Sequence, residues 1–389
     1  MTTVDRWQLP DGVEEVLPEQ ALVVERLRRE LLDLYRSWGY QLVIPPLMEF
    51  TESLLIGLGR DLDLLTFKMT DQISGRTLGI RADITPQVAR IDAHSLAQPG
   101  VTRLCYAGSI LHTRPQSLLA SRSPIQLGAE LYGDDSLAAD VEVISLMLAT
   151  LECAGLAQVT LDLGHVGVYE AVLRAAQLAP EQEAEVFDAL QRKSRPDLVQ
   201  ALDGLAEPTV TLITGLLDLH GDASVLARAR DQLIHAAPDA LDAVMALEAV
   251  AAAVGQRHPE LAIYFDLAEL RGYHYHTGMV FAAYVPGHGQ ALANGGRYND
   301  VGKVFGRARP ATGFATDLKS LMTLFPAVGA DSGAISAPVT DTPELLARVA
   351  ALRAAGEVVI NRLGTDPDPR CDRQLVEVAG EWLVQPLAS

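Results

Sequence analysis

The sequence predicts an α+β fold built on a mainly antiparallel sheet. Predicted strands follow one another without an intervening helix, as at residues 101–110 and 124–132. Strands and helices do not alternate regularly, as a doubly wound parallel sheet would require. The stretch from about residue 167 to 258 is rich in Ala and Leu, is broken by prolines, and predicts several short helices. We therefore expect a sheet-based core that carries a helical insertion.

Local patterns predict the individual elements on either side of that insertion. Helices are expected where apolar residues recur at three- and four-residue spacing and Gly or Pro marks an end. Before the insertion we expect, in order, a helix at 19–38, strands at 41–44 and 76–81, a helix with Thr85 as N-cap and Pro86 at N1, strands at 101–110 and 124–132, a helix at 140–154 and a strand at 159–163. After it we expect strands at 261–267 and 278–285, a glycine- and turn-rich stretch at 291–316, a helix at 316–325, and a tail with a helix at 344–355 and a strand at 357–361.

The chain is long enough for two or three domains. It has 389 residues, of which 49% are hydrophobic, so it can bury a large core. Small residues at 327–338 predict a flexible linker. We expect a core at residues 1–326 with the insertion inside it, then the linker, then a small C-terminal α/β subdomain at 339–389.

Net charge excludes one large class of function. Lys and Arg total 31 and Asp and Glu total 50, a net charge of −19, so the chain repels a phosphate backbone on average. No run of about 18 uncharged apolar residues predicts a membrane span, and residues 1–10 lack the apolar segment of a signal peptide. The three cysteines show no CxxC pairing, which suits a reducing compartment. We expect a cytoplasmic protein without nucleic-acid or membrane partners.

A first polar cluster lies at residues 81–87, where a strand meets a helix. Asp83 and Thr85 place a carboxylate and a hydroxyl at the start of the helix, where backbone N–H groups are free. A carboxylate there can hold an ammonium group. Ordinary capping by Asp83 or Thr85 explains the same pattern.

A second cluster lies on a predicted strand. Gln126, Gly128 and Glu130 share one face because side chains alternate along a strand. The glycine is expected to leave room above the sheet for a small ligand. The alternative is a solvated strand face.

A third cluster spans residues 271–278. His274 and His276 are two residues apart and are expected to face together on a strand, with His288 as the nearest further metal ligand. The spacing is not diagnostic of zinc, and hydrogen bonding is the more common role of such histidines. Arg271 is suited to pairing with a carboxylate, either of a ligand or in a structural salt bridge.

A fourth cluster, at residues 293–300 and 313–315, is rich in glycine and permits close backbone approach. No dinucleotide-binding, P-loop, zinc-protease or serine-hydrolase motif is present. The sequence therefore predicts neither a cofactor nor a metal.

Taken in order, these clusters resemble the histidyl-tRNA synthetase family of class II synthetases over roughly residues 8–325. The resemblance implies a class II fold, a dimer through motif 1 and a pocket for histidine. It is carried by Asp11-Gly12-Val13, by Ile44-Pro45-Pro46-Leu47-Met48-Glu49 (motif 1), by residues 81–85, by Arg114-Pro115-Gln116 with residues 126–130 (motif 2), by Arg271-Gly272 with Tyr275-His276-Thr277-Gly278, and by Gly295-Gly296-Arg297-Tyr298.

The chain departs from that family where ATP would be held. Leu111 and Thr113 stand where motif 2 carries an arginine and a glutamate, and Ser320 stands where motif 3 carries an arginine. Loss of one charged transition-state contact commonly lowers a rate about 10²- to 10³-fold. The chain after the last motif is also too short for the anticodon-binding domain. These losses predict a protein that does not catalyse adenylation.

Residues 104–115 are similar to a second family, the ATP phosphoribosyltransferase regulatory subunits, which derive from the synthetase. That resemblance implies a non-catalytic chain that assembles, as a homodimer within a hetero-oligomer, with a short phosphoribosyltransferase catalytic chain. It also implies a role in the first step of histidine biosynthesis and in feedback inhibition by histidine.

The resemblance further implies a set of residues that hold histidine. Asp83, Thr85 and Gln126 would hold the ammonium group and Arg271 the carboxylate. Glu130 would accept from the imidazole, with Tyr275 and His276 nearby. Two alternatives remain: an active adenylating enzyme, and a structural scaffold with an empty pocket.

Overall fold

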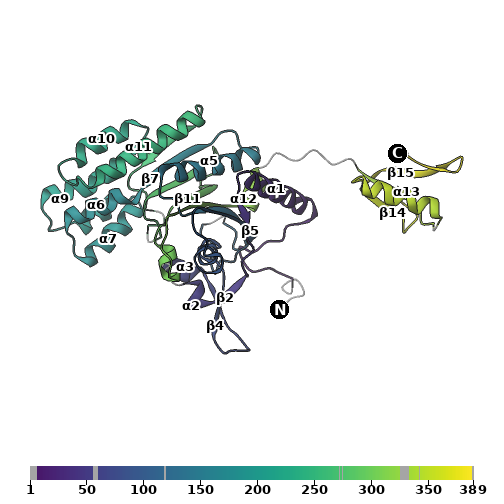
Figure 1. Cartoon of the computed structure of the whole chain (residues 1–389), viewed down its shortest axis with the longest axis horizontal. Coiled ribbons are helices and arrows are strands. Elements are labelled where there is room, and N and C mark those ends of the chain that lie inside the picture. The colour runs from purple at the N-terminus through teal and green to yellow at the C-terminus, as the bar shows by residue number, and fades with distance from the viewer. Residues whose placement is uncertain are drawn as a thin grey trace. The chain divides into compact units, whose positions relative to one another are not determined.

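The computed structural model describes residues 7–55, 60–117, 120–270, 272–273, 275–324, 333–340 and 342–387, with only the backbone described at residues 60 and 61. The chain divides into two compact units, Met1–Phe325 and Pro326–Ser389 (Figure 1). Each unit contains its own cluster of buried apolar side chains. The candidate site lies in the first unit.

A large sheet forms the centre of the first unit. Its described strands run in the order β1-β5-β6-β12-β11-β10-β7-β9-β8, and among them the pairs β1–β5 and β7–β9 are parallel while the others are antiparallel. The predicted α+β class is confirmed. The strands are β1 (Gln41–Leu42), β5 (Thr102–Ser109), β6 (Ile125–Tyr132), β7 (Thr160–His165), β8 (His220–Gly221), β9 (Ala262–Asp266), β10 (Met279–Tyr284), β11 (Ala293–Arg297) and β12 (Ala311–Asp317).

Three helices pack together against the sheet. They are α1 (Pro18–Ser37), α5 (Leu137–Cys153) and α12 (Leu318–Leu324). The buried face of α1 consists of Val24, Leu27, Leu31 and Tyr35. The Tyr35 hydroxyl lies 3.0 Å from the Thr150 hydroxyl, so the buried phenol has a polar partner.

The Ala- and Leu-rich stretch forms a bundle of helices between β7 and β9, at one end of the large sheet (Figure 1). Alanine and leucine favour helices, and the prolines stand at helix starts. The helices are α6 (Val166–Ala176), α7 (Pro180–Gln191), α8 (Arg195–Ala201), α9 (Glu207–Gly215), α10 (Ser224–Leu233) and α11 (Ala240–Arg257), with a 3₁₀ turn at Leu216–Asp218.

The turn-rich stretch predicted at 291–316 is confirmed only in its middle, at 298–310. On either side it contributes two adjacent strands of the sheet, β11 and β12, joined through a 3₁₀ turn at Val301–Phe305. The glycines are needed for close packing: a Cβ at Gly295 would lie 2.8 Å from the Phe281 ring, and a Cβ at Gly313 would overlap the Glu130 carboxylate. Glycine here marks close approach within a sheet rather than a turn.

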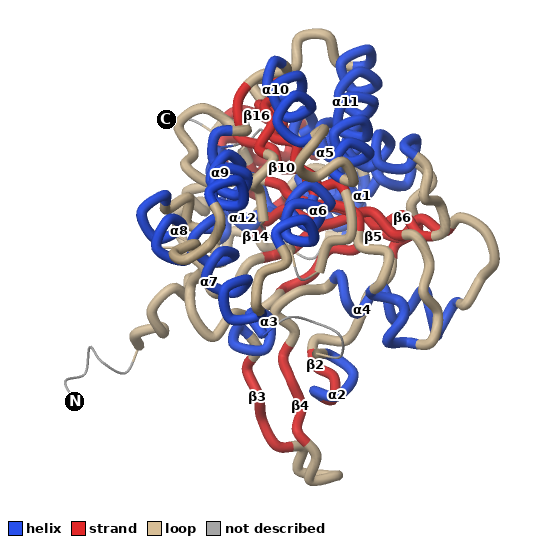
Figure 2. The backbone as a smooth tube through the Cα atoms, turned by 90° about the vertical axis from the view of Figure 1, so that its left-hand side faces the viewer, coloured by secondary structure: helices blue, strands red, loops and turns tan. Residues whose placement is uncertain are grey.

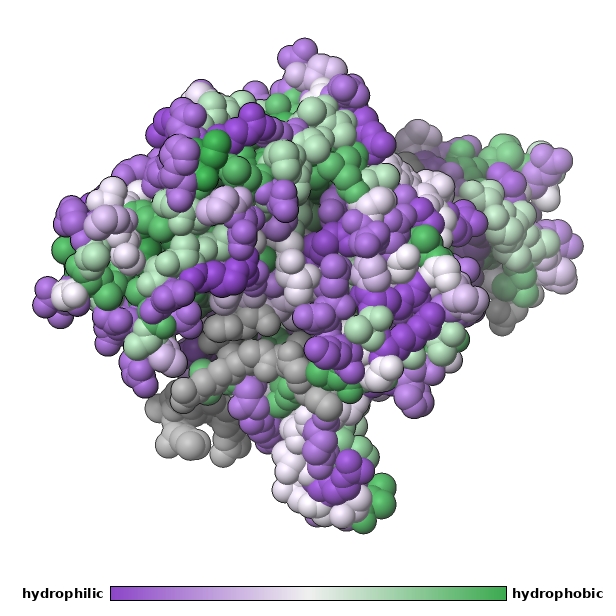
Figure 3. Space-filling model, turned by 60° about the vertical axis from the view of Figure 1, so that its left-hand side comes forward, coloured by the Kyte–Doolittle hydropathy of each residue, from purple (hydrophilic) through white to green (hydrophobic). Residues whose placement is uncertain are grey.

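A small sheet forms an arm on the first unit. Its strands are β2 (Met48–Phe50), β4 (Thr77–Ile80) and β3 (Phe67–Thr70), accompanied by the short helices α2 (Thr51–Leu54) and α3 (Arg60–Leu65). The β3–β4 hairpin projects from the body (Figure 2), and hydrophobic residues are visible on its outer surface (Figure 3). At its turn, Ile73 is 97% exposed. Helix α4 (Thr85–Arg90), which continues as a π-helical turn at Ile91–Leu96, follows the arm in sequence.

The second unit is a four-stranded sheet, as far as its described residues show, in the order β14-β13-β15-β16 with helix α13 (Pro343–Ala354). Its strands are β13 (Ala334–Ala337), β14 (Val359–Asn361), β15 (Cys371–Val378) and β16 (Glu381–Pro386). The predicted linker at 327–338 was wrong at its end, because small residues 334–337 form a buried strand instead. Residues 327–332 lie outside the described part.

Within the described residues, no helix combines the length and apolar character needed to cross a membrane.

Candidate functional site

A cavity of about 320 Å³ opens on the first unit, where the middle strands of the large sheet meet the start of α4 and helix α7 of the insertion. The cavity is large enough for a small ligand. Among the residues predicted as a site, it is lined by Asp83, Thr85, Gln126, Glu130, Tyr275 and His276. Side chains from the first and second clusters and from the turn at 272–278 are therefore brought together.

Asp83 is held in place at the start of α4. Its Oδ1 accepts hydrogen bonds from the Gln126 Nε2 at 2.8 Å and from the Thr85 N–H at 2.9 Å. The amide oxygen of Gln126 accepts in turn from the Ile84 N–H at 2.8 Å. Both hydrogen bonds that Asp83 accepts from described residues end on Oδ1. The cluster therefore fixes one carboxylate and directs it at the cavity.

Thr85 does not cap α4, contrary to our prediction. Ile84 occupies the N-cap position and Thr85 is the first helical residue. The Thr85 N–H instead donates the capping hydrogen bond to the carboxylate of Asp83, two residues earlier. The Thr85 hydroxyl is instead 3.0 Å from the Tyr106 hydroxyl, because the turn aims it at the sheet.

Glu130 lies at the buried inner end of the cavity and is 1% exposed. Its Oε1 accepts from the Tyr106 hydroxyl at 3.0 Å, and its Oε2 accepts from the Tyr298 hydroxyl. Burial raises the pKa of this carboxyl to about 8, and the nearby charge of Asp83 adds to the rise. Glu130 is therefore largely protonated at neutral pH when no ligand is present.

We predicted that Gly128 leaves room for a ligand, and this prediction is wrong. The Tyr106 ring occupies the space over it, and a Cβ there would lie 2.6 Å from the Phe314 carbonyl oxygen and closer still to the Tyr106 hydroxyl. The glycine lets Tyr106 reach Glu130 and Thr85. Its role is to position the buried carboxyl rather than to admit a ligand.

Residues 272–273 and 275–278 form turns and bends and not the strand we predicted. Tyr275 packs on Tyr298 with ring centroids 4.9 Å apart, and its buried hydroxyl has no hydrogen-bond partner among the described residues. The His276 ring lies against Gly272 and Gly296, where a Cβ would come within 2.8 Å. Close chain packing at these glycines favours the turn over a strand.

Arg271 and His274 lie outside the described residues, so the predicted carboxylate contact of Arg271 stays a prediction. The zinc alternative includes His274 and is therefore not tested; within the described part of the chain, no group of three potential ligands gathers.

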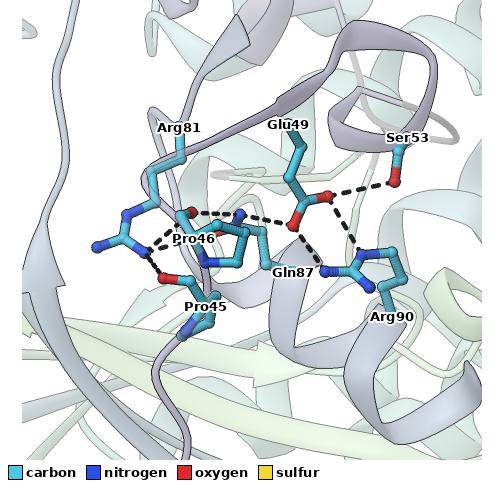
Figure 4. A network of polar contacts seen from close by, with 7 residues as sticks. All are labelled: Pro45, Pro46, Glu49, Ser53, Arg81, Gln87 and Arg90. Atoms are coloured by element: carbon cyan, nitrogen blue, oxygen red, sulfur yellow. Dashed lines mark hydrogen bonds and ion pairs between the residues drawn. The ribbon is translucent and has the colours of Figure 1, made fainter. Parts of the chain in front are cut away.

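Arg81, in the same cluster as Asp83, supports the site from behind. Its guanidinium donates to the carbonyl oxygen of Pro45 at 2.8 Å (Figure 4). It also donates to the carbonyl oxygen of Ser109 at 2.9 Å. Next to it, Glu49 pairs with Arg90 of α4 at 2.6 Å. These contacts tie the motif 1 segment to the helix that carries the site. Arg81 is thus a structural cation and not a ligand contact.

Arg297 is also structural. It is 7% exposed and forms an ion pair with buried Asp140, Nη2 to Oδ1 at 3.0 Å. Neither Arg81 nor Arg297 lines the cavity. Among the described residues that do line it, four have carboxyl groups and none is Lys or Arg; the four are Asp83, Glu130, Asp162 and Glu269. The cavity favours a cationic group and disfavours a phosphate.

At the positions that the synthetase resemblance assigns to ATP, the residues make hydrogen bonds within the chain itself. The Thr113 hydroxyl donates to the Leu64 carbonyl at 2.6 Å, so this segment is pinned to α3. Leu111 donates only its N–H, to the Arg81 carbonyl at 3.1 Å. The Ser320 hydroxyl donates to Asp317 Oδ2 at 2.9 Å in the first turn of α12. None of these side chains offers a cation.

Sequence reasoning missed Tyr106 and Tyr298 as residues of the site. Tyr298 belongs to the Gly-Gly-Arg-Tyr element, and that was the available signal for it. Tyr106 lies in a strand whose alternation of apolar and polar residues gives no sign of a site. Its role is shown only by its contact with Glu130, 24 residues away in sequence.

Comparisons with known proteins agree with this geometry. Residues 12–321 match the family model described as histidyl-tRNA synthetase, and residues 332–385 match the ATP phosphoribosyltransferase subunit HisZ C-terminal domain. Among solved structures, an ATP phosphoribosyltransferase regulatory subunit/histidyl-tRNA synthetase from Bacillus halodurans superposes with a TM-score of 0.81 at 26% identity, covering 92% of this chain and 94% of that one. A histidyl-tRNA synthetase from a Nostoc species has a TM-score of 0.76 at 17% identity, covering 98% and 97%, and shows the fold alone.

Curated relatives are more similar still. The ATP phosphoribosyltransferase regulatory subunits of Pseudomonas fluorescens strain Pf0-1 and of Pseudomonas savastanoi pv. phaseolicola are each 54% identical over 395 residues, and each alignment covers 100% of both chains.

The fold and the cavity together define a class II, histidyl-tRNA synthetase-like protein whose described cavity lining holds no Lys or Arg. Within that class, the chain belongs to the family of ATP phosphoribosyltransferase regulatory subunits. It is a regulatory chain in histidine biosynthesis and not itself a catalyst, so the alternative of an active adenylating enzyme is set aside.

Proposed function

We propose that the cavity binds free histidine and that its occupancy controls a separate, short phosphoribosyltransferase chain by feedback inhibition. The observation that carries the proposal is the charge of the cavity: its described lining holds carboxylates and neither Lys nor Arg. An α-amino acid brings an ammonium group to such a site, whereas a nucleotide brings phosphates.

The inner residues suit the two ends of histidine. Asp83, oriented by Gln126, faces the cavity as a partner for the ammonium group. Glu130 and the Tyr275 hydroxyl, which has no hydrogen-bond partner among the described residues, offer polar atoms to a ring held deeper in the sheet. A buried hydroxyl without a partner is costly, so a ligand atom that bonds to it would stabilise the complex.

We also propose that the chain forms a homodimer through the motif 1 segment, within a hetero-oligomer with the catalytic chain. Apolar side chains on this segment are exposed: Ile44 is 81% exposed, and Leu47 and Met48 are each 51% exposed. Exposed apolar residues that gather on one segment are typical of an interface. The cysteines of the chain are unpaired, which is consistent with the reducing cytoplasm.

Calorimetry tests the proposal. Histidine titrated into the complex with the short catalytic chain is expected to give a saturable heat, and Asp83→Ala is expected to abolish both that heat and inhibition by histidine. Coupling between such sites is typically about 1–3 kcal/mol, so inhibition should be clearly measurable. A complex that is active but gives no heat with histidine, and no change in inhibition on Asp83→Ala, would support a scaffold with an empty pocket.

A further inference from the structure

The last strand of the second unit, β16, is an open edge of its sheet. It has six residues, Glu381–Pro386, and pairs with β15 on one side. Among the described residues, the other strands at sheet edges are shorter: β1 and β8 have two residues each, β2 and β14 three each, and β3 four. Short edge strands, lysine and proline keep sheet edges from pairing with other chains. In contrast, β16 is long, has no lysine, and has its proline at its last residue.

The hairpin that joins β15 to β16 determines which backbone groups face the open edge. The turn residues 379–380 have φ of 53° and 87°, as in a type I′ turn, so Val378 and Glu381 are hydrogen-bonded to each other. Hydrogen-bonded and non-hydrogen-bonded pairs then alternate along the antiparallel ladder. Beyond the far end of the strand, Leu387 donates its N–H to the Asp372 carbonyl at 2.8 Å, which fits the same alternation.

Trp382 and Val384 therefore direct their N–H and C=O groups away from β15, toward the open edge. Their side chains pack against the apolar core of the second unit, on the face that α13 covers. Leu383 lies on the opposite face of the sheet and is 41% exposed. The next residue with outward backbone groups is Pro386, which has no N–H and so ends the row of donors. The edge thus presents free donors and acceptors with an exposed leucine between them.

This arrangement is complementary to itself. When two copies of β16 run antiparallel about Leu383, Trp382 of each copy lies opposite Val384 of the other, and each outward N–H meets a C=O. The tryptophan then packs beside a β-branched valine, and Leu383 packs on its counterpart, as in favourable cross-strand pairs. Glu381, the one charged residue of the strand, lies opposite Gln385 and not opposite a second carboxylate. Backbone groups, apolar side chains and charge are all matched in this register.

A shifted register loses these matches. Moving the centre of symmetry to Val384 would place Trp382 opposite Pro386, which has no N–H to donate. The same shift would place Leu383 opposite Gln385 and remove the pairing of the two leucines. The sequence of the strand therefore favours the register centred on Leu383.

We propose that β16 pairs antiparallel with β16 of a second copy of the chain, in the register centred on Leu383, so that the sheets of the two C-terminal units join. This interface goes beyond the proposed function, because it lies in the second unit and requires neither histidine nor the motif 1 segment. The contact uses the same strand in both copies and has two-fold symmetry, so it joins two copies and no more. It also removes the one long open edge among the described strands.

Disulfide cross-linking of the full-length chain tests the register. Leu383 faces its counterpart in a non-hydrogen-bonded pair, whose Cα atoms are about 4.5 Å apart, and a disulfide spans about 4.4–6.8 Å. Leu383→Cys, oxidised with glutathione disulfide, is therefore expected to give a covalent dimer on a denaturing gel. Leu363→Cys is the matched control: Leu363 is 90% exposed in the same unit but lies outside β16, so this variant should stay monomeric. The wild type, treated in the same way, accounts for the chain's own cysteines.

Hydrogen exchange measures the same contact in the wild-type chain and needs no substitution. The amides of Leu383 and Gln385 are bonded to β15, whereas those of Trp382 and Val384 have no partner strand among the described residues. We expect all four amides to exchange slowly. Leu383→Lys places like charges opposite each other, so exchange at Trp382 and Val384 should become at least about tenfold faster while Gln385 stays slow. Leu363→Lys is the control and should change none of these rates.

The outcomes separate this interface from its alternatives. Fast exchange at Trp382 and Val384 in the wild type, or a Leu383→Cys chain that gives no more dimer than Leu363→Cys, would overturn the inference. Protection that appears only when the short catalytic chain is added would overturn it too, and would assign the edge to a strand of that chain. Cross-linking through Leu383→Cys in a chain that fails to bind histidine would remove the proposed function and still support this interface.

Discussion

Two regions of the first unit use their polar side chains differently: the inner end of the cavity, and the positions that the synthetase resemblance assigns to ATP, here called the nucleotide end. At the inner end, Asp83 is held by two hydrogen bonds and Glu130 by two tyrosine hydroxyls, and both carboxylates face the cavity. At the nucleotide end, the Thr113 hydroxyl donates to the Leu64 carbonyl and the Ser320 hydroxyl donates to the Asp317 carboxylate. One end keeps polar atoms oriented toward a ligand, while the other has turned them inward.

This difference separates function from stability. A buried carboxyl with a raised pKa destabilises the folded state at neutral pH, so its retention needs a reason beyond packing. A helix-capping pair such as Asp317 and Ser320 stabilises the fold and needs no other reason. The comparison predicts that substitutions at the inner end change ligand binding strongly, and that those at the nucleotide end change stability only.

The largest expected effect is on binding at the inner end. Asp83→Ala removes the partner of the effector's ammonium group, and loss of one member of a buried charge pair costs about 3–4 kcal/mol. Histidine affinity should therefore fall about 100- to 1000-fold by calorimetry. Ser320→Ala is the matched control and should leave affinity unchanged. Equal losses in the two variants would break the comparison.

The next effect is a pH dependence of stability. The folded-state pKa of Glu130, about 8, exceeds the ordinary value of 4.5, so this group binds more protons in the folded state and its contribution to stability falls as pH rises from about 4.5 to 8. Glu130→Gln removes that loss. We expect the variant to gain about 3 kcal/mol over the wild type between pH 5 and pH 8 in urea unfolding. A difference independent of pH would show that Glu130 is ionised in the fold.

A smaller effect is expected where the network is packed. Gly128→Ala places a methyl group against the Tyr106 hydroxyl and the Phe314 carbonyl, which should cost about 1–3 kcal/mol of stability and displace Glu130. Gly255→Ala, in helix α11 with open space around it, is the control and should stabilise by about 0.5–1 kcal/mol. Denaturant melts measure both. If Gly128→Ala were as stable as the control, Gly128 would not be needed to seat Tyr106.

The smallest effect sharpens the other side of the comparison. Ser320→Ala removes one hydrogen bond to Asp317 in the first turn of α12, so we expect a loss of about 0.5–1 kcal/mol of stability in the same melts. Inhibition by histidine in the complex should not change. A changed inhibition constant in Ser320→Ala would show that the nucleotide end still takes part in ligand binding.

The sequence alone predicted the class of fold and singled out several residues that line the cavity, but it did not show how the cavity is built. Asp83, Gln126 and Glu130 were predicted because motifs keep their spacing along the chain. The roles of Tyr106 and Tyr298 depend on contacts across strands that are 24 and 168 residues away from Glu130 in sequence, which no local pattern encodes.

Glycines misled the local predictions for the same reason. A glycine in a sequence predicts either a flexible backbone or space for a neighbouring group. The packing around it in the folded protein decides between the two. At Gly128 and Gly313 the neighbours are the Tyr106 ring and the Glu130 carboxylate, so both glycines belong to strands and serve the buried network. Local pattern alone suggested ligand space at the first and turns around the second.

One paired measurement tests the central claim, that the amino-acid end is kept and the nucleotide end is lost. The same purified chain, alone and with the short catalytic chain, is titrated with histidine by calorimetry and assayed for histidine-dependent ATP–pyrophosphate exchange. We predict saturable histidine binding in the complex, abolished by Asp83→Ala, together with no exchange above background. Robust exchange, or histidine binding that survives Asp83→Ala unchanged, would contradict the account.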